Sequence, residues 1–350
     1  MSLHVVQLGP IPPPEGGISR NIQAIRAALL ARGDRCSIVA TSKSTTTIDD
    51  PDLFYPRTPA ALLKTVRSLN AGVLHLHVGG DLSRRVLMMA GAVALLARGR
   101  SVLTVHSGEF PKTDAAKSAK RNSLMGRVFR AFSHLIAVNE ELADVFERFG
   151  VPRESISVIT PFAPLLPDPN AVAPKTIAEF DLRFGEMLLW VGGMERDYDP
   201  LTAVRAFELV AAERPGAGMI MIGDGSRRAE VETFVSSSPC SERILVAGNV
   251  EHAVTFRLMA FSNAILRTTL FDGDAISVRE GLFLNTPVVA TDTGNRPPGC
   301  RLCVVGDPNS IAEAIIETLE KGLLDRPDLV EDDSNILAVL NIYDDLSKQD

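Results

Sequence analysis

The feature that most constrains the fold is an alternation of short apolar runs with amphipathic segments, which occurs twice along the chain. Before residue 161 the runs predicted to be strands lie at 4–8, 36–40, 73–77, 101–106, 134–138 and 155–160. After residue 174 they lie at 187–191, 218–222, 243–247, 263–267, 287–291 and 301–305. Strands that alternate with helices are typical of βαβ units and parallel sheets. The chain is therefore predicted to be an α/β protein with two doubly wound, Rossmann-like sheets.

A proline-rich stretch separates the two halves. Residues 161–174, PFAPLLPDPNAVAP, include five prolines, which remove backbone donors and favour extended backbone. We therefore predict an N-terminal domain over 1–165 and a C-terminal domain over 166–334. The apolar pattern near the end of the chain predicts a helix within 335–350 that crosses back to the first domain. Ligands of doubly wound sheets bind beyond the carboxyl ends of the strands, so both domains are expected to line one interdomain cleft.

The charge of the chain is divided unevenly between the two halves. The net charge is −7, but residues 1–165 carry 20 basic and 13 acidic residues, whereas residues 166–350 carry 16 and 30. A basic first half indicates an anionic partner. Nucleic acid is disfavoured because no zinc finger, aromatic RNA-binding motif or helix-turn-helix pattern is present. Residues 112–132 predict a basic amphipathic helix, either on an anionic membrane surface or simply solvated.

Location and metal binding follow from what the sequence lacks. No run of 18 apolar residues is present, and the N-terminus reads as a strand and not as a signal peptide. We therefore expect a cytoplasmic protein, with peripheral membrane contact as an option. Cys300 and Cys303 have metal-ligand spacing, but no second ligand pair accompanies them, so no metal site is expected.

The most informative segment for function is 271–291, FDGDAISVREGLFLNTPVVAT. Asp272 and Glu280 stand eight positions apart around a Gly-Asp-Ala turn, before a predicted helix and strand. Gly273 permits unusual backbone angles. The N–H groups at the helix start are expected to bind a diphosphate, and they belong to Asp274, Ala275, Ile276, Ser277 and Val278. Asp272 is expected to bind sugar hydroxyls, and Glu280 the hydroxyls of a ribose. The alternative is that both acids only stabilise the helix start.

Two further positions in the first half could contact a ligand. His106 follows a predicted strand and could donate to substrate hydroxyls or polarise a reacting sugar, or it could simply be a bonded loop histidine. Gly16 and Gly17 open the first predicted helix, where they could admit an anion or form a tight turn. Their spacing does not match the nicotinamide fingerprint, which disfavours a dehydrogenase.

Taken together, these motifs resemble the retaining glycosyltransferases of family four, which have the GT-B fold, over nearly the whole chain. The matching elements are the Gly16-Gly17 helix start, His106, VNEELADVF–FGVP–SISVIT (138–160), the WVGG and IGDG strand ends, Asp272-x7-Glu280 with PVVAT, and GDPNSIAEAI (306–315).

The resemblance implies transfer of a hexose from a nucleotide-diphosphate sugar to a glycan or polyprenyl-linked acceptor, as in bacterial polysaccharide biosynthesis. It also implies retention of configuration and no cofactor or essential metal. By the same resemblance, Glu280 would bind the ribose and Asp272 the donor sugar. His106 would contact the sugar from the first domain, so His106 and Asp272 are the candidate catalytic residues. Catalysis would consist of positioning and stabilisation of the departing diphosphate.

The chain departs from the family pattern at the diphosphate clamp. Gly193 stands where the family has an arginine, and Tyr198 stands near the position of a lysine. Arg196 and Arg267 are hypothesised to compensate, and Asp272 is one methylene shorter than the usual glutamate. Two alternatives stay open: a GT-B sugar-nucleotide epimerase, which would need an acid/base pair, and a non-catalytic nucleotide-sugar-binding protein.

Overall fold

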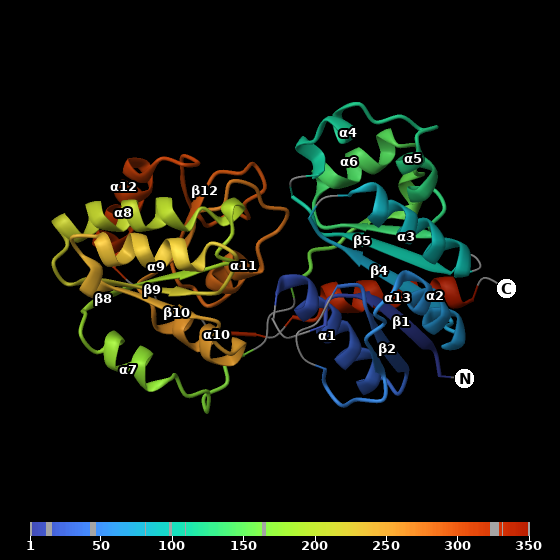
Figure 1. Cartoon of the computed structure of the whole chain (residues 1–350), viewed down its shortest axis with the longest axis horizontal. Helices are drawn as coiled ribbons and strands as arrows, with labels where there is room; N and C mark the ends of the chain where they lie inside the picture. Colours follow the sequence, from blue (N-terminus) through green and yellow to red (C-terminus); the bar gives the residue numbers. More distant parts are fainter. Residues whose placement is uncertain are drawn as a thin grey trace. The chain divides into compact units, whose positions relative to one another are not determined.

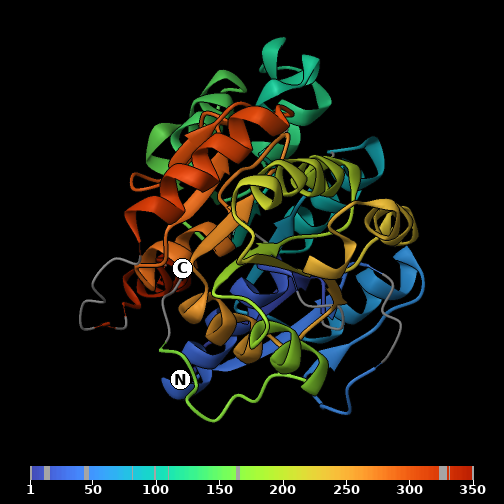
Figure 2. The same cartoon turned by 90° about the vertical axis from the view of Figure 1, so that its left-hand side faces the viewer.

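The computed structural model of the chain describes residues 2–11, 16–42, 47–80, 82–97, 100–108, 110–162, 166–322, 329–330 and 332–348. The chain divides into two compact units (Figure 1), and Figure 2 gives the same cartoon turned by 90° about the vertical axis. Unit 1 comprises Met1–Ala163 and Asp332–Asp350, and unit 2 comprises Pro164–Glu331. Each unit is an α/β sandwich with helices on both faces of a parallel sheet.

Unit 1 contains, within the described residues, a parallel sheet with strand order β3-β2-β1-β4-β5-β6-β7. The strands are β1 (His4–Gly9), β2 (Arg35–Ala40), β3 (Leu53–Phe54), β4 (Val73–Val78), β5 (Ser101–Val105), β6 (His134–Ala137) and β7 (Ile156–Val158). Six of them match predicted strands. Only β3 was missed, because two residues at the sheet edge carry no periodic signal.

Helices cover both faces of this sheet. One face packs on α1 (Gly17–Ala31) and α13 (Ser334–Ser347). The other face packs on α2 (Pro59–Ser68), α3 (Arg84–Leu96), α4 (Asp114–Lys117), α5 (Leu124–Phe129) and α6 (Glu140–Arg148). Short 3-10 turns lie at η1 (Phe110–Lys112) and η2 (Arg153–Ser155).

The last helix, α13, completes unit 1 although it follows unit 2 in the sequence. It contacts α1 and β4. Its Tyr343 is fully buried, and Asn335 near its start donates to the Thr160 hydroxyl at 2.8 Å and to the Phe162 carbonyl at 2.9 Å. Because these bonds reach the end of the first 163 residues, α13 ties the two sequence segments of unit 1 together.

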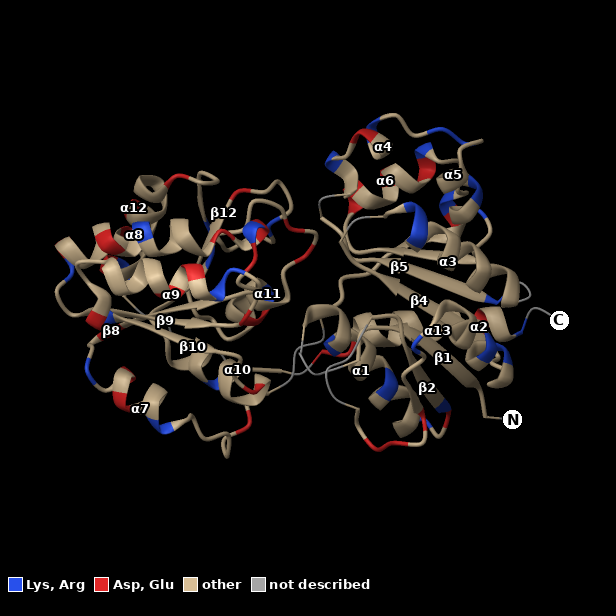
Figure 3. Ribbon diagram, in the orientation of Figure 1, with Lys and Arg blue, Asp and Glu red and all other residues tan. Residues whose placement is uncertain are grey.

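The single amphipathic helix predicted over 112–132 is wrong. Thr113 and Ser123 each accept a backbone N–H and so begin separate short helices, α4 and α5. Val128 and Phe129 of α5 then turn into the core of unit 1. Basic residues do occur in α4, α5 and the segment between them (Figure 3). Arg130, directly after α5, has a role within unit 1, because its guanidinium donates hydrogen bonds to the backbone carbonyls of Arg121 and Phe149.

Unit 2 contains, within the described residues, a parallel sheet with strand order β10-β9-β8-β11-β12-β13. The strands are β8 (Glu186–Val191), β9 (Ala217–Ile222), β10 (Ile244–Gly248), β11 (Ala264–Arg267), β12 (Val288–Thr291) and β13 (Arg301–Cys303), and all match predicted strands. One face packs on α8 (Pro200–Glu213), α9 (Arg228–Ser237) and α12 (Pro308–Lys321). The other packs on α7 (Lys175–Asp181), α10 (His252–Phe261) and α11 (Ile276–Phe283), and η3 (Arg196–Tyr198) and η4 (Ser241–Arg243) are short turns.

The strand orders identify where each unit is expected to bind ligands. In unit 1, β2 and β3 lie on one side of β1, and β4 is the first strand added on the other side of β1. In unit 2, β9 and β10 lie on one side of β8, and β11 is the first strand added on the other side. Crevices at such switch points, beyond the carboxyl ends of the strands, are the usual ligand sites of doubly wound sheets. Most of the predicted site residues lie between the end of β11 and the first turns of α11, and Arg196 lies in the loop after β8.

Candidate functional site

The two loops at the switch point of unit 2 are joined by hydrogen bonds. The backbone N–H of Leu270 donates to the Asp197 carbonyl at 2.8 Å. The Thr268 hydroxyl donates to the Tyr198 carbonyl at 2.9 Å and accepts from the buried Trp190 indole at 3.0 Å. The loop after β8 therefore has a fixed position relative to the loop after β11.

Asp272 lies between two arginines. Its Oδ2 accepts from Arg267 Nε at 2.9 Å, from Arg296 Nη1 at 2.8 Å and from the Thr269 hydroxyl at 3.0 Å. Burial raises the pKa of Asp272, but the two guanidinium groups outweigh burial and the pKa lies below its usual value. Asp272 is therefore a carboxylate, and among the described residues its Oδ1 has no hydrogen-bond partner.

Arg267 is held by a carboxylate and an aromatic ring. Its Cζ lies 4.7 Å from the centre of the Tyr198 ring, and Nη1 donates to the Val191 carbonyl at 3.2 Å. The same ring packs against Gly193, where an added Cβ would lie 3.3 Å from Tyr198 Cε2. The two departures from the family pattern, Gly193 and Tyr198, are thus in contact, and together they place Arg267.

Arg296 was missed in the sequence. Its side chain is only 2% exposed, and besides Asp272 it donates to the Thr291 carbonyl at 2.9 Å and the Thr269 hydroxyl at 2.7 Å. The available signal was an arginine five residues after the strand that ends in PVVAT, which is a weak one. Arg196, by contrast, is exposed.

The start of α11 presents unbonded backbone donors. Among the described residues, no acceptor is found for the N–H groups of residues 274–277. Val278 does not fit the predicted role, because its N–H already donates to the Ala275 carbonyl at 3.1 Å and its side chain is fully buried. The anion-binding part of the helix start therefore ends at Ser277, one residue earlier than predicted.

Asp274 has an unsatisfied oxygen at the same helix start. Its Oδ1 accepts from Arg279 Nε at 2.5 Å, whereas its Oδ2 is buried without a hydrogen-bond partner. Burial raises the pKa of this carboxyl above its usual value, although Arg279 opposes the shift. Because a buried acceptor without a partner is costly, Asp274 Oδ2 marks a place where a ligand donor would be stabilising.

Glu280 is buried and paired with a residue that the sequence reasoning missed. Its side chain is 4% exposed, and Oε1 lies 2.9 Å from Nε2 of His252, the first residue of α10. The His252 ring stacks on Phe256 with centroids 5.6 Å apart. His252 is the single histidine of the second half of the sequence, which was the only signal available.

The predicted glycines of unit 1 form an ordinary helix start. Gly16 is the N-cap of α1, its N–H donates to the Ser19 hydroxyl at 2.9 Å, and that hydroxyl donates back to the Gly16 carbonyl. Gly16 therefore has no free N–H for an anion, and the tight-turn interpretation describes it. Gly17 is exposed at the first turn.

His106 lies one residue beyond β5, also in unit 1. Its Nε2 is 3.3 Å from Nδ1 of His77, a buried residue of β4. The ring is half-buried, and burial lowers its pKa to about 4. The predicted site residues therefore form one group at the switch point of unit 2, with His106, Gly16 and Gly17 in unit 1.

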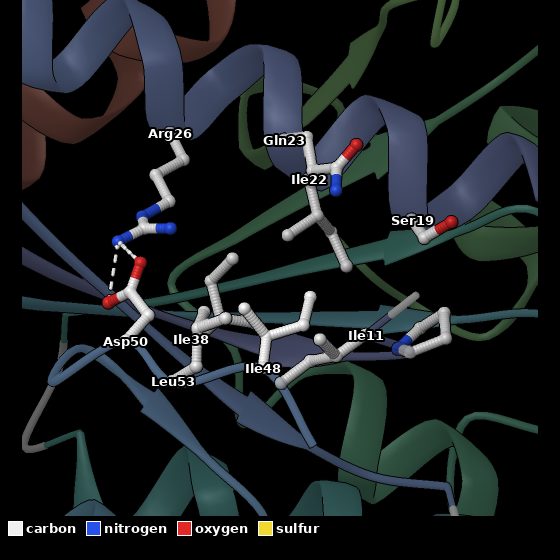
Figure 4. A pocket seen from close by; sticks show the side chains of 10 residues that line it. Ile11, Ser19, Ile22, Gln23, Arg26, Ile38, Ile48, Asp50 and Leu53 are labelled. Atoms are coloured by element: carbon white, nitrogen blue, oxygen red, sulfur yellow. Dashed lines mark hydrogen bonds and ion pairs between the residues drawn. The ribbon is translucent and has the colours of Figure 1, made fainter. Parts of the chain in front are cut away.

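A small cavity of about 130 Å³ lies between α1 and the strands β2 and β3 (Figure 4). Ile22 and Ile38 line it, and the Arg26–Asp50 ion pair, 2.8 Å long, closes one end. None of the predicted site residues lines this cavity, so it is separate from the candidate site.

No helix of the described residues has the length and apolar character needed to cross a membrane. Within the same residues, no cluster of three or more His, Cys, Asp or Glu side chains could hold a metal ion.

Two family models match the chain, one in each half. Residues 15–165 match the model described as Glycosyltransferase Family 4, and residues 185–321 match Glycosyl transferases group 1. An uncharacterised glycosyltransferase of Methanocaldococcus jannaschii is 27% identical over 94 residues, which is 27% of this chain and 23% of that protein.

Solved structures share the fold over almost the whole chain. A glycosyltransferase from Rickettsia africae has a TM-score of 0.66 at 15% identity and covers 100% of both chains. Anabaena HepE, in complex with UDP and glucose, has a TM-score of 0.69 at 13% identity over 99% of this chain and 95% of its own. Sucrose-phosphate synthase of Thermosynechococcus elongatus has a TM-score of 0.70 at 15% identity over 98% and 99%. These similarities establish the architecture of two Rossmann-like units.

Proposed function

We propose that this chain, a family-four-like glycosyltransferase with the GT-B fold, transfers a hexose from a nucleotide-diphosphate sugar to a glycan or polyprenyl-linked acceptor. One observation carries the proposal. At the switch point of unit 2, the start of α11 has N–H groups for which the described residues offer no acceptor. Beside them lie two carboxylate oxygens, Asp272 Oδ1 and Asp274 Oδ2, which have no hydrogen-bond partner among the same residues. Donors and acceptors in this arrangement match a diphosphate joined to a polyhydroxylated sugar.

Each group of the site then has a distinct role. The N–H groups of residues 274–277 bind the diphosphate, where the helix dipole also favours negative charge. Asp272 Oδ1 and Asp274 Oδ2 accept bonds from sugar hydroxyls. Glu280, oriented by His252, binds the ribose. No protein nucleophile is needed, because the rate enhancement comes from positioning and from stabilising the leaving diphosphate.

Arg267 is the cation that we assign to the leaving diphosphate. Its Nη1 is 3.5 Å from the Ser277 hydroxyl, at the helix start that would hold the phosphates. Arg296 is enclosed by Asp272, Thr269 and Thr291 and serves to hold Asp272. We expect Arg267→Met to lower kcat by about 10²-fold, as for loss of one transition-state donor. Arg196→Met serves as the exposed control and should leave kcat unchanged.

A thermal-shift screen of nucleotide sugars tests the donor site. We expect one donor class to raise the melting temperature of the wild type, and Glu280→Gln to lose that shift. Glu251→Gln is the matched control, because Glu251 is exposed and immediately precedes His252 at the start of the same helix, α10. If no nucleotide sugar shifts the wild type, or if Glu280→Gln retains the shift, the assignment of this site is wrong.

Retention, metal independence and the acceptor are further parts of the proposal. Anomeric analysis of the product should show the configuration of the donor, and EDTA should leave turnover unchanged. A product that forms without any acceptor and differs from the donor only in sugar stereochemistry would instead identify an epimerase. Binding of the protein to anionic vesicles at low salt would support a peripheral location on the cytoplasmic face of the membrane, where a polyprenyl-linked acceptor would lie.

A further inference from the structure

Three polar side chains of unit 1 form a chain of hydrogen bonds that ends on His106. Gln7 of β1 is fully buried, and its Oε1 lies 3.1 Å from Nε2 of His77 in β4. Nδ1 of His77 lies in turn 3.3 Å from Nε2 of His106, and the two rings stack with centroids 5.5 Å apart. The bonds therefore run from the middle of the sheet, beside its switch point, to the loop after β5.

The amide of Gln7 sets the direction of these bonds. Its Nε2 lies 3.0 Å from the carbonyl oxygen of Ile22 and 3.3 Å from the sulfur of Cys36. A carbonyl oxygen can only accept, so the amide nitrogen of Gln7 must face Ile22 and its Oε1 must face His77. Since Oε1 also only accepts, His77 must carry its proton on Nε2.

The neutral state of His77 then determines which nitrogen of His106 is protonated. Burial, with smaller effects of His75 and His106, lowers the pKa of His77 well below its usual value. A neutral imidazole has one donor and one acceptor nitrogen. With Nε2 as the donor, Nδ1 of His77 accepts, so Nε2 of His106 donates. Nδ1 of His106 keeps its lone pair, and among the described residues it has no hydrogen-bond partner.

We infer that Gln7 and His77 are positioning residues that hold His106 in its neutral Nε2–H form and present its Nδ1 as an acceptor for a ligand hydroxyl. A neutral acceptor nitrogen binds a hydroxyl and repels a phosphate oxygen, which also only accepts. This reverses the polarity expected from the sequence, where His106 was a donor to substrate hydroxyls. The hydroxyl belongs to the sugar of the donor or to a glycan acceptor, and this ligand part rests on the proposed function.

The protonation pattern can be read by NMR of the full chain with isotope-labelled histidine near neutral pH. We expect His106 to show a protonated Nε2 and an unprotonated Nδ1. Gln7→Met has nearly the same shape but removes the acceptor for His77 Nε2–H. His77 can then move its proton to Nδ1, which forces His106 to populate the opposite, Nδ1–H form.

Thr104→Val is the matched control. The Thr104 hydroxyl is as buried as His77, but it lies 2.7 Å from Nε2 of His75 and makes no bond to His77 or His106. Its loss should leave the His106 pattern unchanged. A wild-type His106 protonated on Nδ1, or on both nitrogens, would overturn the inference even if Gln7→Met failed to fold. An unchanged His106 pattern in folded Gln7→Met would overturn the role of Gln7.

The ligand part is tested with UDP, UDP-glucose and methyl glucoside as probes. A change in the His106 Nδ1 resonance with UDP-glucose but not with UDP would assign the hydroxyl to the donor sugar. A change with methyl glucoside alone would assign it to an acceptor. If UDP-glucose raises the melting temperature and neither sugar changes the resonance, the ligand part is wrong. If UDP-glucose leaves the melting temperature unchanged, the proposed donor site of unit 2 does not bind this nucleotide sugar. The histidine spectrum of the free protein still tests the protonation of His106 in that case.

Discussion

The two units have the same architecture, but the buried polar cluster beside the switch point is charged in unit 2 and neutral in unit 1. In unit 2 the loop after β11 holds a buried charged cluster, in which the Asp272 carboxylate accepts from Arg267 and Arg296. In unit 1, β4 and the residue after β5 carry a neutral cluster built from His75, His77 and His106. The fold therefore does not dictate the electrostatics of the crevice, since the side chains at the strand ends do.

The difference has a physical basis in how each cluster is satisfied. Buried charges are stable only when opposite charges and hydrogen bonds compensate them, and Asp272 receives three such bonds. Among the described residues, His75, His77 and His106 have no carboxylate partner of this kind, and burial lowers the pKa of each of them. Unit 2 thus suits an anionic ligand held by fixed charges, and unit 1 suits a neutral hydroxyl.

The largest expected effect comes from removing the carboxylate of unit 2. Asp272→Ala leaves the buried Arg296 and the mostly buried Arg267 without their carboxylate, which should cost about 3–5 kcal/mol of unfolding free energy. Urea unfolding can be followed through Trp190, the single tryptophan, which is buried in β8 of unit 2.

Glu232→Gln provides the reference for this measurement. Glu232 pairs with Arg228 on the exposed surface of α9, and breaking such a pair should cost less than about 1 kcal/mol. If Asp272→Ala costs no more than Glu232→Gln, the cluster of unit 2 is not the compensated structure described above.

Acidification should destabilise unit 1 at a higher pH than unit 2. The pKa of His106 is about 4, below the 6.5 of an unfolded histidine, so between these values the unfolded state binds more protons. Unit 1 therefore loses stability as pH falls from 6.5 toward 4, on the order of 3 kcal/mol from His106 alone.

Asp272 of unit 2 behaves differently. Its pKa is below the usual 3.8, so its contribution is present above that pH and is lost only as pH falls further. Hydrogen exchange resolved by peptide can follow both units at each pH. Simultaneous loss of protection from exchange in both units between pH 6.5 and 4 would contradict the expectation that unit 1 loses stability at a higher pH than unit 2.

A smaller loss is expected where α13 joins the neutral cluster. The hydroxyl of Tyr343 lies 2.5 Å from Nδ1 of His75, and both residues are fully buried. Tyr343→Phe keeps the ring but leaves that nitrogen without a partner, which should cost about 1–3 kcal/mol. Tyr55→Phe removes a hydroxyl bonded at an exposed site and should cost less. Equal costs for the two variants would mean that the Tyr343–His75 bond does not help to hold α13 in place.

The fold was largely predictable because its signals are periodic and local. Apolar runs separated by helical patterns predicted every strand of the described residues except β3. The helix over 112–132 was wrong because periodicity in that segment reflects two core-facing pieces, and the capping threonine and serine outweighed it.

The site was only partly predictable because its contacts are non-local. Asp272 and Glu280 could be singled out from their spacing, but Arg296 and His252 reach them from 24 and 28 residues away and carry no motif. The protonation of His106 depends on Gln7, which lies on another strand. Such partners become visible only when the sheet order brings distant strands together.

The smallest expected effect concerns the ring that supports Arg267. The Arg267 guanidinium lies 4.7 Å from the centre of the Tyr198 ring, a contact worth about 0.5–1 kcal/mol at a partly exposed site. Tyr198→Leu should lose this amount, and Tyr198→Phe, which keeps the ring face, should not. Both can be measured by urea unfolding through Trp190. If Tyr198→Leu is as stable as Tyr198→Phe, the Tyr198 ring does not help to place Arg267, and the departures from the family pattern at Gly193 and Tyr198 do not provide a new support for this cation.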